Sequence, residues 1–198
     1  MKASSSLKSL VISTTRLKLI HQLFYTPKEI FYVRQLVRAT NEEINSVRRE
    51  LANLKAGNIV ESEVRGNRLY YWANPGGSLF DDLLLLTHKT YGLGAKIIKH
   101  KKRLGKLKFV LFNRDFIAGN IKTTDSVDII FVGSPTLKVL DMLIKAEEIN
   151  RGREINYMVM DKDELILRKS RRDPFIIDFF LSYPAVIIGS SLDLSHVQ

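Results

Sequence analysis

The chain has 198 residues, of which 45% are hydrophobic and 26% are charged. These are ordinary values for a globular protein, and the length allows one large domain or two small ones. The absence of cysteine excludes disulfide bonds, zinc ribbons and thiol nucleophiles. No apolar run approaches the roughly 18 residues that span a bilayer, and the first residues lack the apolar core of a signal peptide. We therefore expect a cytoplasmic protein with no membrane segment.

The net charge of +10 lies entirely in the first half of the chain. Residues 1–104 contain 18 lysines and arginines against 8 acidic residues, whereas residues 105–198 contain 13 of each. A basic half joined to a neutral half is typical of a polyanion-binding module attached to a second domain. A solvated basic face without a partner would have the same composition.

Apolar residues at helical spacing predict three short helices before residue 58. The first begins at Thr14 and is interrupted at Pro27, and the second spans residues 31–39. The third ends at Gly57 and has one apolar face, formed by Ile44, Val47, Leu51 and Leu54.

The segment Thr40-Asn41-Glu42-Glu43 precedes the third helix and has the form of a capping box. In such a box the Thr40 hydroxyl accepts the amide hydrogen of Glu43, and the Glu43 carboxylate reaches back to the Thr40 amide. We therefore expect the third helix to be capped by Thr40.

Residues 59–64 and 68–72 alternate as strands do, and Arg65-Gly66-Asn67 is typical of the turn between them. Three short helices followed by a basic hairpin is the order of a winged helix-turn-helix. The aromatic residues Tyr70, Tyr71 and Trp72 fit packing beneath the third helix better than ligand contact.

With about 100° of rotation per residue, Asn45, Ser46 and Arg49 lie opposite the apolar face of the third helix, with Arg48 on the flank. A recognition helix in the major groove offers such side chains to base edges, where Arg49 could pair with guanine and Asn45 with adenine. We expect Arg65 and Arg68 of the hairpin to reach phosphate or the minor groove. The alternative for each arginine is a solvated surface charge.

The stretch from Thr15 to Asn74, about a third of the chain, resembles the winged-helix regulators of the arsenical-repressor-like group. The resemblance is carried by two segments, Val47-Arg48-Arg49-Glu50-Leu51 with Leu54 and Gly57, and Gly66-Asn67-Arg68-Leu69-Tyr70-Tyr71. It implies double-stranded DNA as the partner and a possible homodimer. We assign residues 7–75 to a DNA-binding domain.

Residues 76–104 are predicted to be linker helices that follow the break at Asn74-Pro75-Gly76-Gly77-Ser78. The helix over residues 79–91 could form a dimer interface or join two domains, and Gly92-Leu93-Gly94 is a candidate hinge. A strongly basic helix over residues 95–104 either extends the DNA-facing surface or is a solvated face.

Residues 105–190 are predicted to form an α/β domain, so that the whole chain is α+β. The expected strands cover residues 108–112, 126–133, 154–160 and 185–188, with helices over 136–150 and from Asp161. This order resembles the minimal nucleotidyltransferase fold, and fusions of a winged helix to that fold form a recognisable family.

The resemblance implies a Gly-Ser-x-x-x-Gly turn that holds nucleotide phosphates and an Asp-x-Asp strand that holds divalent metal. Gly119 matches the last glycine and Asp128 the second carboxylate, but Arg114 and Asp115 replace the first glycine and the serine, and Ser126 replaces the first carboxylate. A third carboxylate position holds Asn156, with Glu154 two residues away.

The damaged motif predicts no catalytic residue, no metal and no cofactor. Asp128 is then a remnant or a capping or salt-bridging residue, while Arg114 and Asp115 either pair with each other or bind a different ligand.

The leading hypothesis is a DNA-binding transcriptional regulator whose inactive second domain serves sensing, partner contact or dimerisation. The alternative is an active Mg-dependent nucleotidyltransferase that the winged helix brings to its target. A third reading is an interaction module that binds protein.

Overall fold

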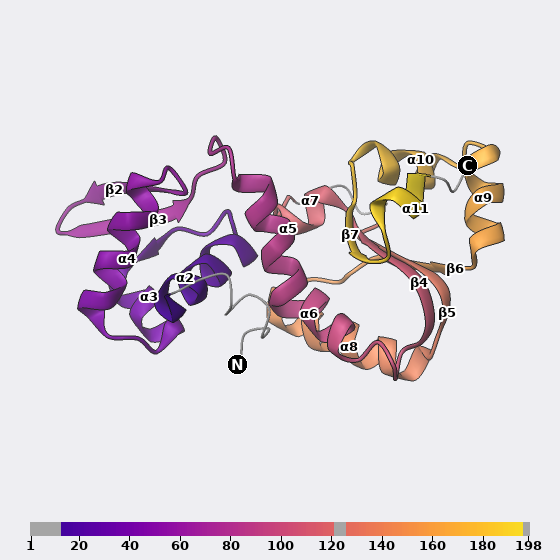
Figure 1. Ribbon diagram of the computed structural model, residues 1–198, viewed down its shortest axis with the longest axis horizontal. Helices are drawn as coiled ribbons and strands as arrows, with labels where there is room; N and C mark the ends of the chain where they lie inside the picture. The colour runs from indigo at the N-terminus through magenta and orange to yellow at the C-terminus, as the bar shows by residue number, and fades with distance from the viewer. Residues whose placement is uncertain (1–12, 121–125, 196–198) are drawn as a thin grey trace. The chain divides into compact units, whose positions relative to one another are not determined.

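The computed structural model describes residues 13–120 and 126–195, and the chain divides into two compact units, residues 1–91 and 92–198. Each unit combines helices with one small sheet, which confirms the α+β class (Figure 1). The expected start of the first domain at residue 7 lies outside the described residues. Within the described ranges, no helix is both long and apolar enough to cross a membrane.

Unit 1 contains the expected three helices, the hairpin and the helix that follows it. Among its described residues, the elements are α2 (Thr14–Tyr25), β1 (Phe31–Tyr32), α3 (Val33–Thr40), α4 (Ile44–Ala56), β2 (Val60–Arg65), β3 (Arg68–Ala73) and α5 (Phe80–Thr90). The apolar faces predicted for α2 and α4 are buried, with Leu17, Phe24, Leu51 and Leu54 at most 2% exposed.

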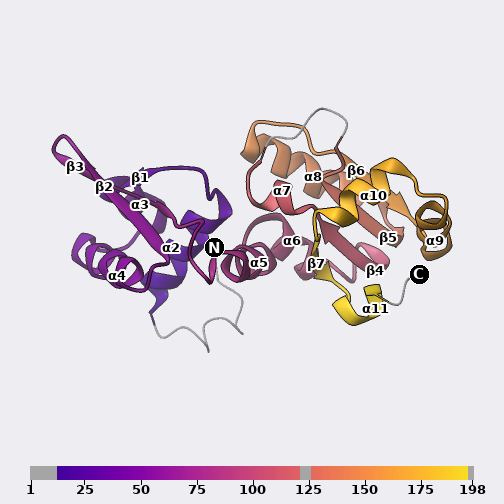
Figure 2. The same ribbon diagram turned by 90° about the horizontal axis from the view of Figure 1, so that it is seen from above.

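The second predicted helix begins two residues later than expected, because Phe31 and Tyr32 form strand β1 instead. This strand pairs antiparallel with β3, with Phe31 opposite Tyr71 and Tyr32 opposite Tyr70. The resulting sheet has the order β1-β3-β2. Gly66 takes the left-handed conformation, with φ of 60°, in the turn of the hairpin, whose tip projects beyond α3 and α4 (Figure 2).

The expected capping box at Thr40 is wrong. Thr40 is the last residue of α3, where its buried hydroxyl donates to the carbonyl oxygen of Leu36 at 2.7 Å. Asn41 leaves the helix in the left-handed conformation, with φ of 51°. The cap of α4 is Glu43, three residues further on, since Thr40 already satisfies its hydroxyl within the preceding helix.

Unit 2 is built on a four-stranded sheet of order β6-β5-β4-β7, in which only β5 and β6 are parallel. Its strands are β4 (Gly105–Phe112), β5 (Ile129–Pro135), β6 (Tyr157–Met160) and β7 (Ala185–Ile188). Its helices are α6 (Gly92–Lys99), α7 (Arg114–Ile117), α8 (Leu137–Arg151), α9 (Lys162–Ser170), α10 (Pro174–Leu181) and α11 (Ser191–Ser195).

Helices lie on both faces of this sheet. On one face, Leu165 of α9 and Ile176 and Phe179 of α10 join a core with side chains of all four strands. Helix α8 lies on the other side of the strands and packs against α6 (Figure 1). The sequence reasoning missed α10, which Asp173 caps through its carboxylate just before Pro174.

The stretch expected to be linker helices, residues 76–104, is divided between the two units. Helix α5 belongs to unit 1, where it packs against α2, and α6 belongs to unit 2. Gly92-Leu93-Gly94, the candidate hinge, forms the first turn of α6, and all three residues are buried.

His21 of α2 gives unit 1 a pH-dependent stability. The ring is 5% exposed, stacks on Tyr91 and lies 3.1 Å from the Thr90 hydroxyl. Burial lowers its pKa from 6.5 to about 4. Between these values the unfolded chain binds a proton that the folded chain excludes, so the free energy of unfolding falls as pH drops from 6.5 towards 4, by at most ~3 kcal/mol.

We expect His21→Gln to remove this part of the pH dependence, because glutamine can contact Thr90 but does not titrate. Denaturant unfolding at several pH values between 4.5 and 7 measures the difference between the two proteins. If the free energy of unfolding varies with pH to the same extent in both proteins, His21 is not the group that causes the pH dependence.

Candidate nucleic-acid interface

Helix α4 is fixed to α2 by an ion pair that starts from a buried carboxylate. Glu50 is 5% exposed, and its Oε2 accepts a hydrogen bond of 2.8 Å from Nε of Arg16. Burial raises the pKa of Glu50, but hydrogen bonds from Ser13 and Arg16 outweigh this effect and hold the pKa below its ordinary value. Glu50 is therefore charged at neutral pH and sets the rotation of α4.

The turn that leads into α4 is also tied to α2. Glu42 accepts hydrogen bonds from Nζ of Lys18 and from the Thr15 hydroxyl, and Lys18 also donates to the carbonyl oxygen of Thr40. These bonds lower the pKa of Glu42, with the hydrogen bond from Lys18 as the largest cause. The start of α4 is thus placed by side chains of a helix more than 20 residues away in the sequence.

Glu43 caps α4 with its own carboxylate. Its Oε2 accepts from the amides of Asn45 and Ser46 at 2.8 and 3.0 Å. These backbone hydrogen bonds, the one from Asn45 first, lower the pKa of Glu43. The negative charge therefore stays at the amino end of the helix, where the free amides and the helix dipole stabilise it.

The side chains predicted to read DNA lie on the outer face of α4. Asn45, Arg48 and Arg49 are exposed and Ser46 is half-buried, whereas Val47 and Glu50 between and beside them are buried. Within the described residues, Arg48 and Arg49 form no hydrogen bond or ion pair. Their guanidinium groups are thus available to a ligand.

Arg65 and Arg68 of the hairpin make different contacts. Arg65, at the end of β2, forms an ion pair of 2.6 Å with Glu63, and both side chains are 52% exposed. The guanidinium group of Arg68 lies over the Tyr32 ring, 4.9 Å from its centroid. The Tyr32 hydroxyl also accepts a hydrogen bond of 3.0 Å from Arg38 of α3. Tyr32 therefore joins the hairpin to α3 and positions Arg68.

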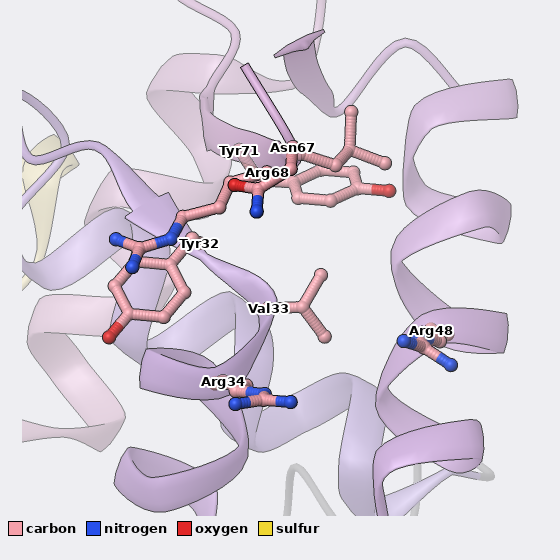
Figure 3. A pocket seen from close by; sticks show the side chains of 8 residues that line it. Tyr32, Val33, Arg34, Arg48, Asn67, Arg68 and Tyr71 are labelled. Atoms are coloured by element: carbon pink, nitrogen blue, oxygen red, sulfur yellow. The ribbon is translucent and has the colours of Figure 1, made fainter. Parts of the chain in front are cut away.

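A pocket of about 660 Å³ lies where α3, α4 and the hairpin meet. Figure 3 shows Arg34 and Arg48 on either side of the opening, with Arg68 folded over Tyr32. The lining residues are Tyr32, Val33, Arg34, Arg48, Asn67, Arg68, Leu69 and Tyr71. The lining contains three guanidinium groups and no carboxylate, so the pocket favours an anion.

Sequence reasoning found Arg48 and Arg68 but missed the other residues of the pocket. Arg34 and Tyr32 were placed in a helix that was predicted to begin at residue 31. Their contribution depends on β1, a strand of two residues that is too short to be recognised from periodicity. The spacing of Arg34 and Arg38, four residues apart on one face of the predicted helix, was the signal in the sequence that could have indicated a basic site.

The Asp128 carboxylate accepts hydrogen bonds from other residues of unit 2. Asp128 is 6% exposed, and both of its carboxylate oxygens accept from Arg153, at 3.1 and 3.2 Å. The amide of Asn156 donates to the same carboxylate at 3.1 Å. Of the alternatives left open by the sequence, the structure supports a salt-bridging residue.

The other positions predicted for a degenerate nucleotide site lie in or after a short helix. Arg114 begins α7, and the Asp115 carboxylate accepts a hydrogen bond of 2.6 Å from Asn120. Gly119 follows in the left-handed conformation, with φ of 69°. The carbonyl oxygen of Ser126 accepts from the Asn156 side chain at 3.3 Å. Across residues 13–120 and 126–195, no three histidine or acidic side chains gather as a metal site would require.

No protein-family model matches this chain, and the searches of curated proteins and of solved structures found no match either.

The role of Asp128 can be tested by its removal. We expect Asp128→Ala to lower the free energy of unfolding by about 2 kcal/mol, because the Asn156 amide loses an acceptor and Arg153 loses its ion-pair partner. Urea denaturation measures this loss. Mg²⁺ should leave the thermal midpoint of the wild-type protein unchanged; a Mg²⁺-dependent rise that Asp128→Ala abolishes would identify a metal ligand instead.

Proposed function

We propose that this protein is a DNA-binding transcriptional regulator, and that unit 1 is a winged helix-turn-helix with α4 as its recognition helix and the β2–β3 hairpin as its wing. The observation that carries the proposal is the exposed basic surface formed by α4, the amino end of α3 and the hairpin. It combines hydrogen-bonding side chains suited to base edges with guanidinium groups suited to phosphates.

The roles of the individual side chains follow from their positions. Asn45 and Arg49 lie opposite the buried face of α4 and would meet base edges in the major groove. Arg48, Arg34 and Arg68 surround the pocket beside the helix and would hold backbone phosphate. Arg65 at the tip of the wing would contact phosphate or the minor groove, in competition with its ion pair to Glu63.

For unit 2, we propose a nucleotidyltransferase-like domain without transferase activity, serving partner contact, sensing or dimerisation. The order of β4, α7, β5, α8 and β6 supports the likeness. The Asp128 carboxylate is already bound by Arg153 and Asn156, and this gives no support to nucleotidyl transfer.

Selection of bound DNA from random oligonucleotides tests the proposed function directly. We expect an enriched sequence with the wild-type protein, and two-fold symmetry in that sequence would indicate that a dimer reads two half-sites. Binding should weaken steeply with salt, because contacts to phosphate release counterions.

Single substitutions then separate the two kinds of contact. We expect Arg49→Ala to weaken binding to the selected sequence roughly 10- to 100-fold and to relax the preference at one base pair. Arg65→Ala should weaken binding to all sequences to the same degree. Titrations with the selected and with scrambled duplexes measure both effects.

Lys55→Ala provides a charge-matched control, because Lys55 is exposed in the last turn of the same helix. It should leave the base preference unchanged. Wild-type DNA affinity in the double variant Arg49→Ala/Arg65→Ala would refute the proposed interface.

A further inference from the structure

Unit 2 carries a second concentration of positive charge that the proposed interface does not use. It starts where α6 ends and continues into β4, with Lys99, Lys101, Lys102, Arg103, Lys106 and Lys108 all exposed. We call these six residues, together with Lys138, the unit 2 basic surface.

Backbone hydrogen bonds hold this surface in shape. The chain turns after α6 through bonds from the amides of Arg103 and Leu104 to the carbonyl oxygen of His100, at 2.8 and 3.0 Å. The buried side chain of Leu104 anchors the turn, and its carbonyl oxygen accepts from the amide of Thr136 at 2.8 Å. This bond brings the start of α8, and with it the exposed Lys138, beside the turn.

No acidic side chain of these segments neutralises the charge. Residues 97–113 and 129–140 contain the seven cations and not one aspartate or glutamate. Over the described parts of the chain, none of the seven forms a salt bridge. The ammonium group of Lys108 lies over the ring of Phe109, 5.8 Å from its centroid. The next lysine back along α6, Lys96, is instead paired with Glu147.

Stabilisation of α6 does not account for so many cations. One or two positive charges in the last turn are enough to complement a helix dipole, and Lys96 and Lys99 already supply them. The further cations repel one another and lower the stability of the folded chain unless a polyanion binds.

We propose that the unit 2 basic surface is a second nucleic-acid contact, which binds the phosphate backbone of duplex DNA without reading its sequence. The chemistry of the surface favours phosphate: it consists of lysines and one arginine, with no exposed aromatic ring between residues 97 and 113 on which an unpaired base could stack. The exposed apolar side chains beside it, Ile98 and Leu137, are too few to anchor a lipid bilayer.

The salt dependence of DNA affinity tests this contact with the full chain and a random-sequence duplex. Each phosphate contact contributes about 0.9 to the slope of log affinity against log salt concentration. The triple variant Lys101→Gln/Lys102→Gln/Arg103→Gln should therefore make the slope shallower by about 2 to 3. The three side chains are exposed, so the circular dichroism spectrum should be retained, and the thermal midpoint should be no lower than that of the wild type because mutual repulsion is relieved.

A matched control removes the same charge elsewhere on unit 2. Lys162→Gln/Arg171→Gln/Arg172→Gln changes three other exposed cations, on and just after α9, and should leave the slope within about 1 of the wild-type value. An equal loss in both triple variants would show an effect of net charge alone and would overturn the proposal.

The test also separates this contact from the proposed interface of unit 1. In an Arg48→Ala/Arg49→Ala background, residual binding to the random duplex should depend on Lys101, Lys102 and Arg103. If that background binds no DNA and the unit 2 triple variant keeps the wild-type slope, the second contact is refuted while the proposed function stands. If only the unit 2 triple variant loses affinity, the second contact stands and the unit 1 interface fails.

Binding to phosphatidylserine vesicles tests the competing partner. If the unit 2 triple variant loses vesicle binding but keeps the wild-type salt dependence of DNA affinity, the surface binds a membrane and the proposal is refuted.

Discussion

The ion pair between Arg16 and Glu50 is the interaction on which the geometry of unit 1 depends. A carboxylate buried to this extent is stable in its charged form only where donors replace the lost water. Because Glu50 lies on the inner face of α4, its bond to α2 fixes the rotation of the helix. Asn45 and Arg49 then face outward, since they lie about half a turn from the buried residues. The ties from Thr15 and Lys18 to Glu42 fix the start of the same helix.

The sequence predicted the parts of the fold that depend on local patterns. The bounds of α2, α4 and the β2–β3 hairpin agree within one or two residues, because apolar periodicity, Pro27, Gly57 and the turn at Gly66 are local signals. The predicted cap of α4 at Thr40 was wrong, because Thr40 is the last residue of α3 and Glu43 caps α4, and the local pattern does not show how far α3 extends. The pocket and the partner of Asp128 could not be predicted, because both join residues from distant segments.

The two basic surfaces have different chemistry. The surface of unit 1 combines guanidinium groups with Asn45 and Ser46, which can donate and accept hydrogen bonds, and with aromatic rings that hold Arg65 and Arg68 in place. The unit 2 basic surface is made mainly of lysine, a mobile point charge on a flexible stem. Directional hydrogen-bonding groups suit discrimination among bases, whereas mobile charges suit contact with a uniform backbone. Together the two would separate specificity from general affinity within one chain.

The cap of α4 has a consequence for how DNA would approach this helix. Helix amino ends often serve as anion sites, because their free amides point at the incoming phosphate. Here the Glu43 carboxylate already occupies the amides of Asn45 and Ser46. The negative charge of this carboxylate repels a phosphate from the amino end of α4. A duplex bound to α4 would therefore be drawn along the helix towards Arg48 and Arg49, and the internal carboxylate would help to set the register in which protein and DNA meet.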